Sequence, residues 1–339
     1  MKILTALVAL LCALSVGAVL SMTSGIFIPL VIAWFMLQIF SPIVTLGEKI
    51  KLPPTVNLIL VCVVFLGVCY LGIRFSAAQL AELDRILAAY RPKLSEMIFN
   101  TAAMLQIPPE VLYDINWLGI LRQFIRDITE GVYAISAKVF LIVVFFILML
   151  LEAPFFHSKI DMAFSESNST TIKNIMSSIS SEISSYLSVL TLIGLATGVC
   201  VWIVLAIIGV ELAAAWAVLA FFMNYIPNVG AVISTILPVM MAVLQFSPGY
   251  IQPVIVLLAV SVIQFVFGNI VAPRMLGSKL GLSPVVIMIS FLVWGTMWGV
   301  SGAVLSVPIA SIIKIVCENV PSLKPIAILM GNGRERRQT

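Results

Sequence analysis

The sequence predicts an all-α protein that crosses a membrane several times. Of its 339 residues, 61% are hydrophobic and only 10% are charged, against about 25% charged in a typical soluble domain. The mean hydropathy of +1.16 agrees. Apolar runs long enough to cross a bilayer as a helix, about 20 residues, recur along the chain. A water-soluble core could not bury this much apolar surface.

Six apolar runs have the length of a single crossing, at 3–22, 26–46, 55–75, 132–152, 187–209 and 251–271. The first follows Lys2 and resembles a signal peptide, but the second begins almost at once and no small-x-small cleavage site stands out. We therefore expect the first run to be a retained span.

Two longer apolar segments, 212–246 and 283–317, would each reach about 52 Å as straight helices, which is too long for one crossing. Both carry helix breakers near their midpoints, Pro227 and Gly230 in the first and Gly299 and Gly302 in the second. Each is predicted to form two half-helices around a break. The fold is then a polytopic protein with about eight hydrophobic spans, two of them broken or re-entrant hairpins.

Two segments of mixed polarity interrupt the spans. Residues 76–131 carry charges of both signs and apolar residues at helical spacing, which predicts an amphipathic, extracytoplasmic helical segment. Residues 154–186 are Ser-rich with one apolar stripe, as in a helix lying along a membrane. The predicted parts are 1–75 (three spans), 76–131, 132–186 (fourth span and cytoplasmic amphipathic helix), 187–317 (transport core of span-plus-hairpin repeats) and 318–339 (cytoplasmic tail).

Basic residues next to the spans predict the orientation. Short basic clusters belong in the cytoplasm, and long loops are exempt from this rule. Both termini are therefore expected in the cytoplasm. The loop that carries Arg274 and Lys279 is cytoplasmic only if 212–246 enters and leaves on the same side, as a hairpin. The other basic residues on which this orientation rests are Lys2, Lys49, Lys51, Lys159, Lys173, Arg334, Arg336 and Arg337.

An internal echo connects the two long segments. The run from Gly230 to Ser234 (Gly-Ala-Val-Ile-Ser) recurs from Gly302 to Ser306 (Gly-Ala-Val-Leu-Ser). Each copy follows a midpoint break, and each is followed by a proline, Pro238 or Pro308. The echo indicates a repeated span-plus-hairpin unit, inverted in the membrane on the hairpin topology. Transporters often have this architecture, with the solute site where the repeats meet.

The first break is the leading candidate for a solute site. Non-helical backbone at membrane depth is tolerated only when it is packed in protein or lines a wet cavity. Pro227 removes a backbone donor, Gly230 permits unusual dihedral angles, and the amides of Asn224 and Asn228 flank them. We expect these groups to face a hydrated cavity opposite the Gly302 break. The alternative is a kink needed only for packing, which the two amides satisfy.

Other polar or bulky residues in the spans are further pathway candidates, each with a structural alternative. Arg274, after Asn269, could contact solute or anchor the helix at the membrane surface. A lone amide such as Gln245 or Gln264 often joins two helices by a hydrogen bond. Trp294, with Trp298, could form a gate or pack against the neighbouring glycines.

Several function classes find no support in the sequence. The spans hold no deep carboxylate of the kind that binds a coupling ion, and there is no ATP-binding, zinc-protease or serine-nucleophile motif. The five cysteines lie in apolar runs, and the one histidine, His157, has no partner at metal-ligand spacing. The charge of +4 follows the spans rather than forming a nucleic-acid surface. We expect no enzyme, no cofactor and no metal site.

These residues resemble the autoinducer-2 exporter family along essentially the whole chain, most densely from 186 to 317. The likeness rests on Leu150-Leu151-Glu152-Ala153-Pro154, Ala215 through Phe221, Asn224 through Gly230, Gly268-Asn269, Pro273-Arg274, Gly277 through Ser283, Trp294-Gly295, Gly299, Gly302 and Leu305-Ser306-Val307-Pro308.

The resemblance implies a bacterial inner-membrane exporter of the quorum-sensing signal autoinducer-2, or of another small solute. It further implies eight spans, homo-oligomers reported as pentamers, and an elevator-like mechanism. Some relatives are described as sodium/proton antiporters. Two positions depart from close relatives, with Leu190 in place of a lysine and Ala272 in place of a glutamate. The substrate or the coupling can therefore differ here.

Three hypotheses remain open. The first is an exporter or facilitator for a small, neutral, polar solute, with autoinducer-2 the best guess, because neutral solutes need amides and carbonyls rather than counter-charges. The second is a cation/proton antiporter that uses backbone carbonyls at the breaks. The third is a membrane scaffold or sensor working through 76–131, which would have no need of non-helical backbone in the membrane.

Overall fold

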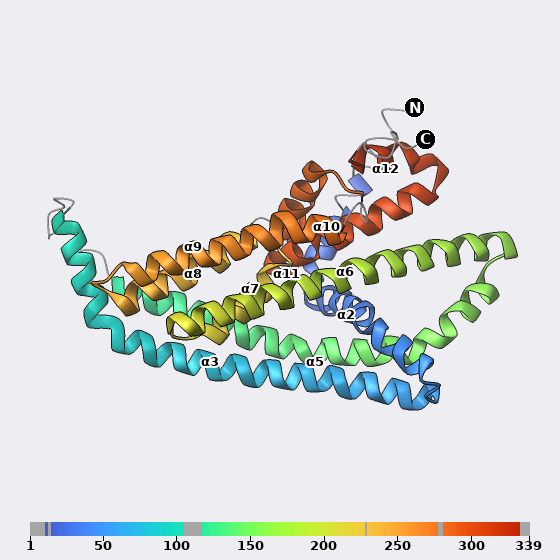
Figure 1. Ribbon diagram of the computed structural model, residues 1–339. Helices are drawn as coiled ribbons and strands as arrows, with labels where there is room; N and C mark the ends of the chain where they lie inside the picture. The colour runs from blue at the N-terminus through green and yellow to red at the C-terminus, as the bar shows by residue number, and fades with distance from the viewer. Residues whose placement is uncertain (1–10, 13–14, 105–116, 228, 277–280, 333–339) are drawn as a thin grey trace. The chain divides into compact units, whose positions relative to one another are not determined.

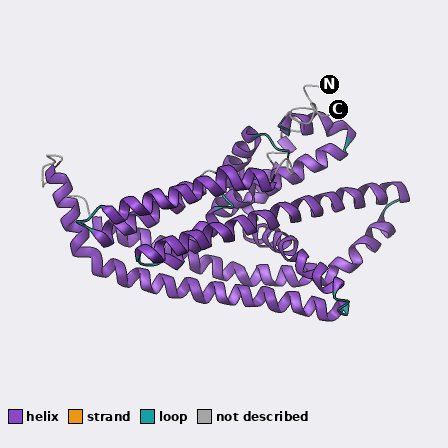
Figure 2. Ribbon diagram, viewed as in Figure 1, coloured by secondary structure: helices purple, strands orange, loops and turns teal. Residues whose placement is uncertain are grey.

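The computed structural model describes residues 11–12, 15–104, 117–227, 229–276 and 281–332. Within these ranges the chain is helical, apart from short turns and an antiparallel bridge between Leu282 and Gly331 (Figure 2). The helices labelled in Figure 1 are α2 (Ser24–Lys49), α3 (Pro54–Met104), α5 (Trp117–Ala163), α6 (Glu166–Ile208), α7 (Ala213–Met223), α8 (Val229–Phe246), α9 (Ile251–Phe265), α10 (Ala272–Leu276), α11 (Pro284–Asn319) and α12 (Lys324–Met330). A π-helix (Val266–Val271) joins α9 to α10, and a 3-10 helix (Pro321–Leu323) precedes α12.

Seven helical stretches in the described ranges are long and apolar enough to cross a membrane. They confirm the predicted all-α, polytopic fold class. The predicted first span, 3–22, lies partly outside the described residues. The seven stretches are Ser24–Lys49, Pro54–Tyr90, Lys138–Phe156, Asn168–Ile208, Val229–Phe246, Ile251–Leu276 and Pro284–Asn319.

The spans and the segment of mixed polarity share continuous helices. Helix α3 has 51 residues and would extend about 77 Å, far more than one crossing. It carries the predicted span 55–75 and runs on into 76–131 without a turn. Helix α5 likewise begins within 76–131 and continues through the span 132–152. The boundaries proposed from the sequence at 75 and 131 therefore fall inside helices.

The chain divides into two compact units. The first comprises residues 1–66, 138–190 and 276–339, and the second comprises residues 67–137 and 191–275. Each unit combines segments that are far apart in the sequence.

In the first unit, a proline in α2 creates a polar contact with α6. Pro42 has no backbone N–H, so the carbonyl of Gln38, four residues earlier, loses its helical donor. The hydroxyls of Ser41 and Ser184 donate to that carbonyl at 2.8 and 3.0 Å. Ser180 donates to the Gln38 side-chain oxygen at 2.8 Å. The side-chain oxygen and the freed backbone carbonyl of Gln38 thus accept hydrogen bonds from serines, which accounts for part of the Ser-rich composition of α6.

The same unit contains an aromatic cluster from α2, α3 and α5. The rings of Phe65 and Phe146 stack with centroids 4.0 Å apart, and Phe40 meets both edge-on. All three side chains are buried. Such aromatic pairs add about 0.5–1.5 kcal/mol beyond their buried area.

The second unit has a core built from α6, α7, α8 and α9. The distal half of α3 contributes Ile86 and the partly buried Tyr90 to it. The other buried members are Val201, Leu205, Val210, Ala220, Met241, Ala242, Val256 and Val260.

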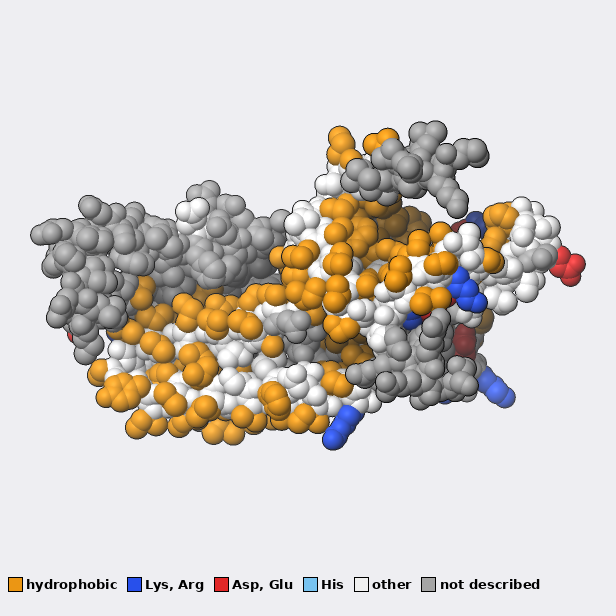
Figure 3. Space-filling view, turned by 90° about the horizontal axis from the view of Figure 1, so that it is seen from above, with side chains coloured by type: hydrophobic (Ala, Val, Ile, Leu, Met, Phe, Trp, Pro, Cys, Tyr) orange, Lys and Arg blue, Asp and Glu red, His pale blue; other side chains and the backbone are white. Residues whose placement is uncertain are grey.

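Helix α9 shows why a bilayer is needed around this core. Val256 and Val260 on one face are fully buried, whereas Leu258 and Val262 on the opposite face are 61% and 60% exposed. A helix that is apolar on all sides belongs in a core or a membrane. Hydrophobic side chains are also spread over the visible surface in Figure 3. The exposed face of α9 is therefore expected to contact lipid.

Candidate functional site

The segment 212–246 folds into a helical hairpin in the second unit. Helix α7 ends at Met223, α8 begins at Val229, and the two helices pack together. With 11 residues, α7 is about 16 Å long, roughly half the apolar thickness of a bilayer. This helix cannot cross a membrane. The predicted break within 226–230 is confirmed, although the turn begins slightly earlier, at Asn224.

Gly230 sits where the two arms of this hairpin meet. A Cβ atom there would lie 1.8 Å from the carbonyl oxygen of Met223, the last residue of α7. No side chain can fit in this space. The glycine is therefore required by the close approach of the first turn of α8 to the end of α7.

The polar groups of the turn are held mainly by local bonds. The Asn224 side-chain amide donates to the carbonyl of Ala220 at 2.7 Å, and the backbone N–H of Asn224 donates to the same carbonyl at 3.2 Å. The Tyr225 hydroxyl shares a hydrogen bond of 2.7 Å with Thr191 of α6. The carbonyl of Pro227, a partly buried residue, accepts from Val229 N at 2.6 Å. Asn228 lies outside the described residues.

The segment 283–317 also folds back on itself, in the first unit. Ser290 Oγ donates to the carbonyl of Ser306 at 2.7 Å. In a straight helix, residues 16 apart are separated by about 24 Å. The reversal occurs at Gly299, whose φ of 62° and ψ of −141° are not helical. The predicted break near 298–302 is therefore confirmed, and α11 consists of two arms.

Gly302 has the same role in this hairpin as Gly230 has in the other. A Cβ atom on Gly302 would lie 1.8 Å from the carbonyl oxygen of Trp294, in the opposite arm. In both hairpins the next polar residue of the echo, Ser234 or Ser306, is buried and donates its hydroxyl to a carbonyl of its own helix at 2.7 Å. The sequence echo thus corresponds to two similar local structures.

The two tryptophans of the second hairpin pack against each other. The rings of Trp294 and Trp298 lie with centroids 4.8 Å apart, and Trp298 Nε1 donates to the carbonyl of Leu20 at 3.0 Å. Trp298 is buried, while Trp294 is partly exposed. The Trp298 indole thus connects the hairpin to the helical residues that precede α2, and Trp294 remains a candidate for a gate.

The two glutamines of the spans make contacts between helices. Gln264, buried in α9, donates to Ser234 Oγ of α8 at 2.7 Å. Gln245, at the end of α8, donates to the carbonyl of Gly209 at 2.8 Å and accepts from Glu211 N at 2.9 Å. These bonds hold the α6–α7 turn and the α8–α9 contact. They favour the interpretation that both glutamines join helices rather than contact solute.

Asn269 and Arg274 lie on a different part of the second unit. Asn269 is in the π-helix that follows α9, and Arg274 is in α10. Both side chains are exposed. Single π-turns within helices are frequent at functional sites, because they shift the backbone register. The position of the two residues thus keeps them as pathway candidates.

A polar cluster at the α6–α7 turn could not be recognised from the sequence. The Tyr90 hydroxyl of α3 donates to Glu211 Oε1 at 3.2 Å. Lys93, one turn along α3, donates to the backbone carbonyl of Gln245 at 2.9 Å. Glu211 Oε2 is buried and makes no hydrogen bond within the described part of the chain. The only feature of the sequence that pointed to this cluster was the helical spacing of Tyr90 and Lys93.

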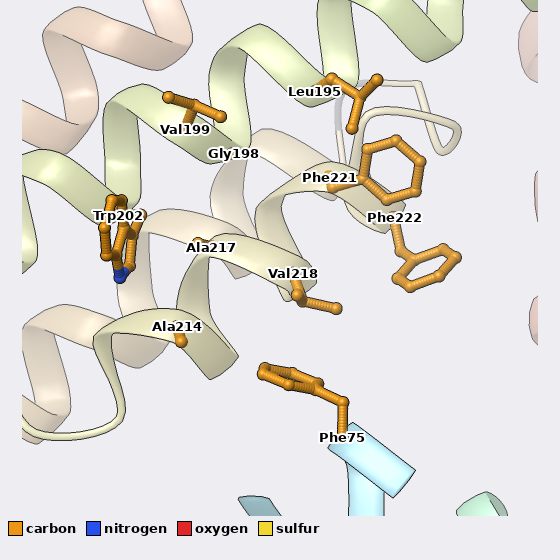
Figure 4. A pocket seen from close by; sticks show the side chains of 10 residues that line it. All are labelled: Phe75, Leu195, Gly198, Val199, Trp202, Ala214, Ala217, Val218, Phe221 and Phe222. Carbon is orange, nitrogen blue, oxygen red and sulfur yellow. The ribbon is translucent and has the colours of Figure 1, made fainter. Parts of the chain in front are cut away.

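An open cavity of about 430 Å³ lies beside the first hairpin (Figure 4). Helices α6 and α7 line most of it, with Phe75 of α3 opposite Val218. Phe221 and Phe222, from the end of α7, border it, and the Trp202 indole is the polar side-chain group in the lining. Among the residues that the structure describes, no pathway candidate lines this cavity. A solute with several hydroxyl groups would find few hydrogen-bond partners there.

The structure thus brings some candidates together and leaves others apart. Asn224, Pro227 and Gly230 share one turn, and Gln264 reaches the same hairpin through Ser234. Gln245 is at the other end of α8. Trp294 and Gly302 form part of the hairpin of the first unit.

Comparison with known proteins is consistent with this architecture. A profile of the AI-2E family of transporters matches residues 4–322. YhhT of Escherichia coli K12, whose transport role is itself only proposed, is 32% identical over 321 residues, covering 92% of this chain and 90% of YhhT. The AI-2 transport protein TqsA of Escherichia coli K12 is 31% identical over 315 residues, covering 91% of this chain and 90% of TqsA. With its seven long apolar helices, the chain belongs to the AI-2E transporter family and is a multi-pass inner-membrane protein.

Proposed function

We propose that this protein exports a small, neutral, polar solute, or facilitates its movement, and that autoinducer-2 is the first solute to test. The observation that carries the proposal is the pair of helical hairpins, each broken at a glycine-containing turn inside an otherwise apolar segment. The name of the relative TqsA, an AI-2 transport protein, supports the choice of solute. A transporter of this kind is not expected to be an enzyme.

The hairpin turns offer the hydrogen-bonding groups that such a solute requires. A break in a helix leaves carbonyls and N–H groups without helical partners, and lipid cannot satisfy them. Pro227 contributes no N–H to its turn, and Gly299 departs from helical geometry in the other. We therefore place the solute pathway along Asn224, Pro227, Asn228 and Gly230, with Asn269, Arg274, Trp294 and Gly302 as further candidates. Gln245 and Gln264 support the pathway by positioning α8.

Neutral solutes suit this pathway better than charged ones. The first hairpin, 213–246, contains no charged residue, and α9 contains none either. A charged solute would have to lose its hydration without a counter-charge, which costs far more than the loss of hydrogen bonds to a neutral solute.

Cation/proton antiport is the second candidate function. The observation in its favour is Glu211, whose Oε2 atom is buried without a hydrogen-bond partner in the described part of the chain. An ion bound there, or at the carbonyls of the breaks, would satisfy such oxygens.

The proposed setting is a homo-oligomer, a pentamer by resemblance to the family, in the bacterial inner membrane with both termini in the cytoplasm. Lipid covers the apolar outer faces, and the small solute is the remaining partner. No cofactor is required by this proposal.

Everted vesicles distinguish the two functions. Vesicles that contain the protein should accumulate autoinducer-2, or another small polyol-like solute, faster than control vesicles. Sodium-dependent proton movement without solute accumulation would favour antiport. Vesicles that show neither activity with a range of neutral solutes and monovalent cations would contradict both proposals and favour a scaffold or sensor.

A further inference from the structure

Helix α12 is attached to both ends of the second hairpin. Because α11 reverses at Gly299, its two ends lie on the same side of the first unit. Helix α12 follows the second arm after a short 3-10 helix. At its other end, Ser283 N donates to the carbonyl of Met330 at 2.9 Å, and Asn332 N donates to the carbonyl of Gly281 at 3.1 Å. Since α11 is one of the apolar stretches long enough to cross a membrane, these attachments place α12 near the membrane surface.

The same attachments determine which face of α12 points outward. Ala327 is buried, as is Leu282, which pairs with Gly331 in the antiparallel bridge. Successive residues of an α-helix are rotated by about 100° around its axis. Leu329, two positions after Ala327, therefore lies on the opposite face of α12.

The outward face of α12 is apolar and exposed. Ile326, Ile328 and Leu329 are 47%, 62% and 80% exposed, and the preceding Pro325 is exposed as well. No polar side chain interrupts this face, because residues 325–330 read Pro-Ile-Ala-Ile-Leu-Met. Large apolar side chains that are exposed together mark a surface that contacts a membrane or a protein. We therefore expect this face to be covered by something other than water.

The charges on either side of this face favour anionic lipid. Lys324, at the start of α12, is exposed and forms no ion pair within the described part of the chain. The sequence after Asn332 adds Arg334, Arg336 and Arg337, and Glu335 is the one acidic residue from 320 to 339, so this segment carries four basic residues and one acidic residue, a net charge of +3. Basic residues that flank an apolar helix attract anionic headgroups. A face-to-face contact between two copies would instead bring like charges together.

We propose that α12 lies in the headgroup layer of the membrane and binds anionic phospholipid there. Ile326, Ile328 and Leu329 point toward the acyl chains, and Lys324 and the arginines that follow Asn332 attract the anionic headgroups. The bridge to Leu282 then connects the membrane surface to the segment that leads into α11. This inference does not rest on the identity of the solute.

The first test measures whether residue 329 contacts lipid in vesicles of phosphatidylcholine and phosphatidylglycerol. A nitroxide spin label is attached to L329C in the full-length protein without its five native cysteines. Collisions of the label with oxygen, which dissolves in lipid, are compared with collisions with a neutral nickel chelate, which dissolves in water. The lipid reference is V262C, on the exposed apolar face of α9, and the water reference is S165C, in the exposed turn between α5 and α6.

We expect the oxygen-to-nickel ratio of L329C to exceed that of S165C several-fold and to approach that of V262C. If L329C behaves like S165C, the face is in water and the proposal is overturned. If the label collides with neither reagent, protein from the second unit or from another copy covers the face, which also overturns the proposal.

The second test concerns the charge of the lipid. The oxygen-to-nickel ratio of L329C is measured again in vesicles of phosphatidylcholine alone, and in the mixed vesicles after the additional substitutions K324Q, R334Q, R336Q and R337Q. Both changes should lower the ratio, because each removes the attraction between the basic residues and the anionic headgroups. A ratio that stays the same after both changes would overturn the assignment to anionic lipid.

A third measurement uses the unmodified protein and applies even if the cysteine-free chain fails to fold. Hydrogen exchange of the backbone amides of 324–332 is compared in lipid nanodiscs with and without phosphatidylglycerol. We expect several-fold slower exchange with the anionic lipid, because a helix that binds the membrane surface opens less often. The turn that contains Phe164 and Ser165 should exchange equally in both. Equal exchange of 324–332 in the two kinds of nanodisc would contradict the proposal.

Discussion

The close approach at the second hairpin yields a quantitative prediction for G302A. The new Cβ atom would lie 1.8 Å from the Trp294 carbonyl oxygen and 2.9 Å from Trp298 Cβ. Non-bonded carbon and oxygen atoms come no closer than about 3.3 Å, so the two arms of α11 must part by about 1.5 Å. Overpacking of this kind costs about 1–3 kcal/mol and occasionally more. We expect the upper part of this range, because the obstructing atom belongs to the backbone and cannot rotate away.

The matched control is G295A in the first arm of the same helix. A Cβ atom on Gly295 would meet no other atom within 4 Å. Alanine is also preferred over glycine inside a helix by about 0.5–1 kcal/mol. G295A should therefore leave the stability of the protein unchanged or slightly raised.

The assay is unfolding of the purified protein in detergent, followed by tryptophan fluorescence, with solute flux measured on the same preparations. G302A should lower both the free energy of unfolding and the flux, and G295A should lower neither. If G302A is as stable as G295A, the two arms do not meet at Gly302, and the hairpin geometry derived for α11 is wrong.

Three further predictions concern the first hairpin and the topology. N228L should weaken apparent solute affinity two- to tenfold, which corresponds to one lost hydrogen bond of about 0.5–1.5 kcal/mol, and should leave the melting temperature unchanged. N224L should lower the melting temperature, because the Asn224 side chain bonds to the carbonyl of Ala220. Equal effects of the two variants on the melting temperature would contradict this division of roles. Reporter fusions at the C-terminus and near Pro108 should be active on opposite sides of the membrane, and a C-terminal fusion active in the periplasm would overturn the orientation. S278C, in a background without the five native cysteines, should react with an impermeant thiol reagent only from the cytoplasmic side, and labelling from outside would mean that 212–246 crosses fully.

The hairpins could be predicted from the sequence because local chemistry determines them. Pro227 and Gly230 interrupt an apolar run whose length exceeds one crossing, and Gly299 and Gly302 do the same in the second. Helix propensity and bilayer thickness are sufficient for that inference. The echo from Gly230 and Gly302 added the expectation that the two breaks are alike, and both glycines indeed lie against a carbonyl of the opposite arm.

The roles of the polar side chains could not be predicted in the same way, because they depend on partners distant in the sequence. The partner of Gln264 is a serine 30 residues earlier, and that of Gln38 is a serine 142 residues later. Lys314 appears peripheral in the sequence because it is near the end of an apolar run, yet it is buried against Glu318. Sequence periodicity identifies which helix carries such a residue but not what the residue contacts.

The measurement that tests the central claim most directly is solute flux by the purified protein in sealed proteoliposomes. The claim is that the protein moves a small, neutral, polar solute and that this movement requires the broken hairpins. We predict saturable autoinducer-2 flux that competing neutral polyols reduce and that G302A lowers while G295A preserves. Flux that does not saturate, or that is equal in both variants and in empty liposomes, would contradict the claim.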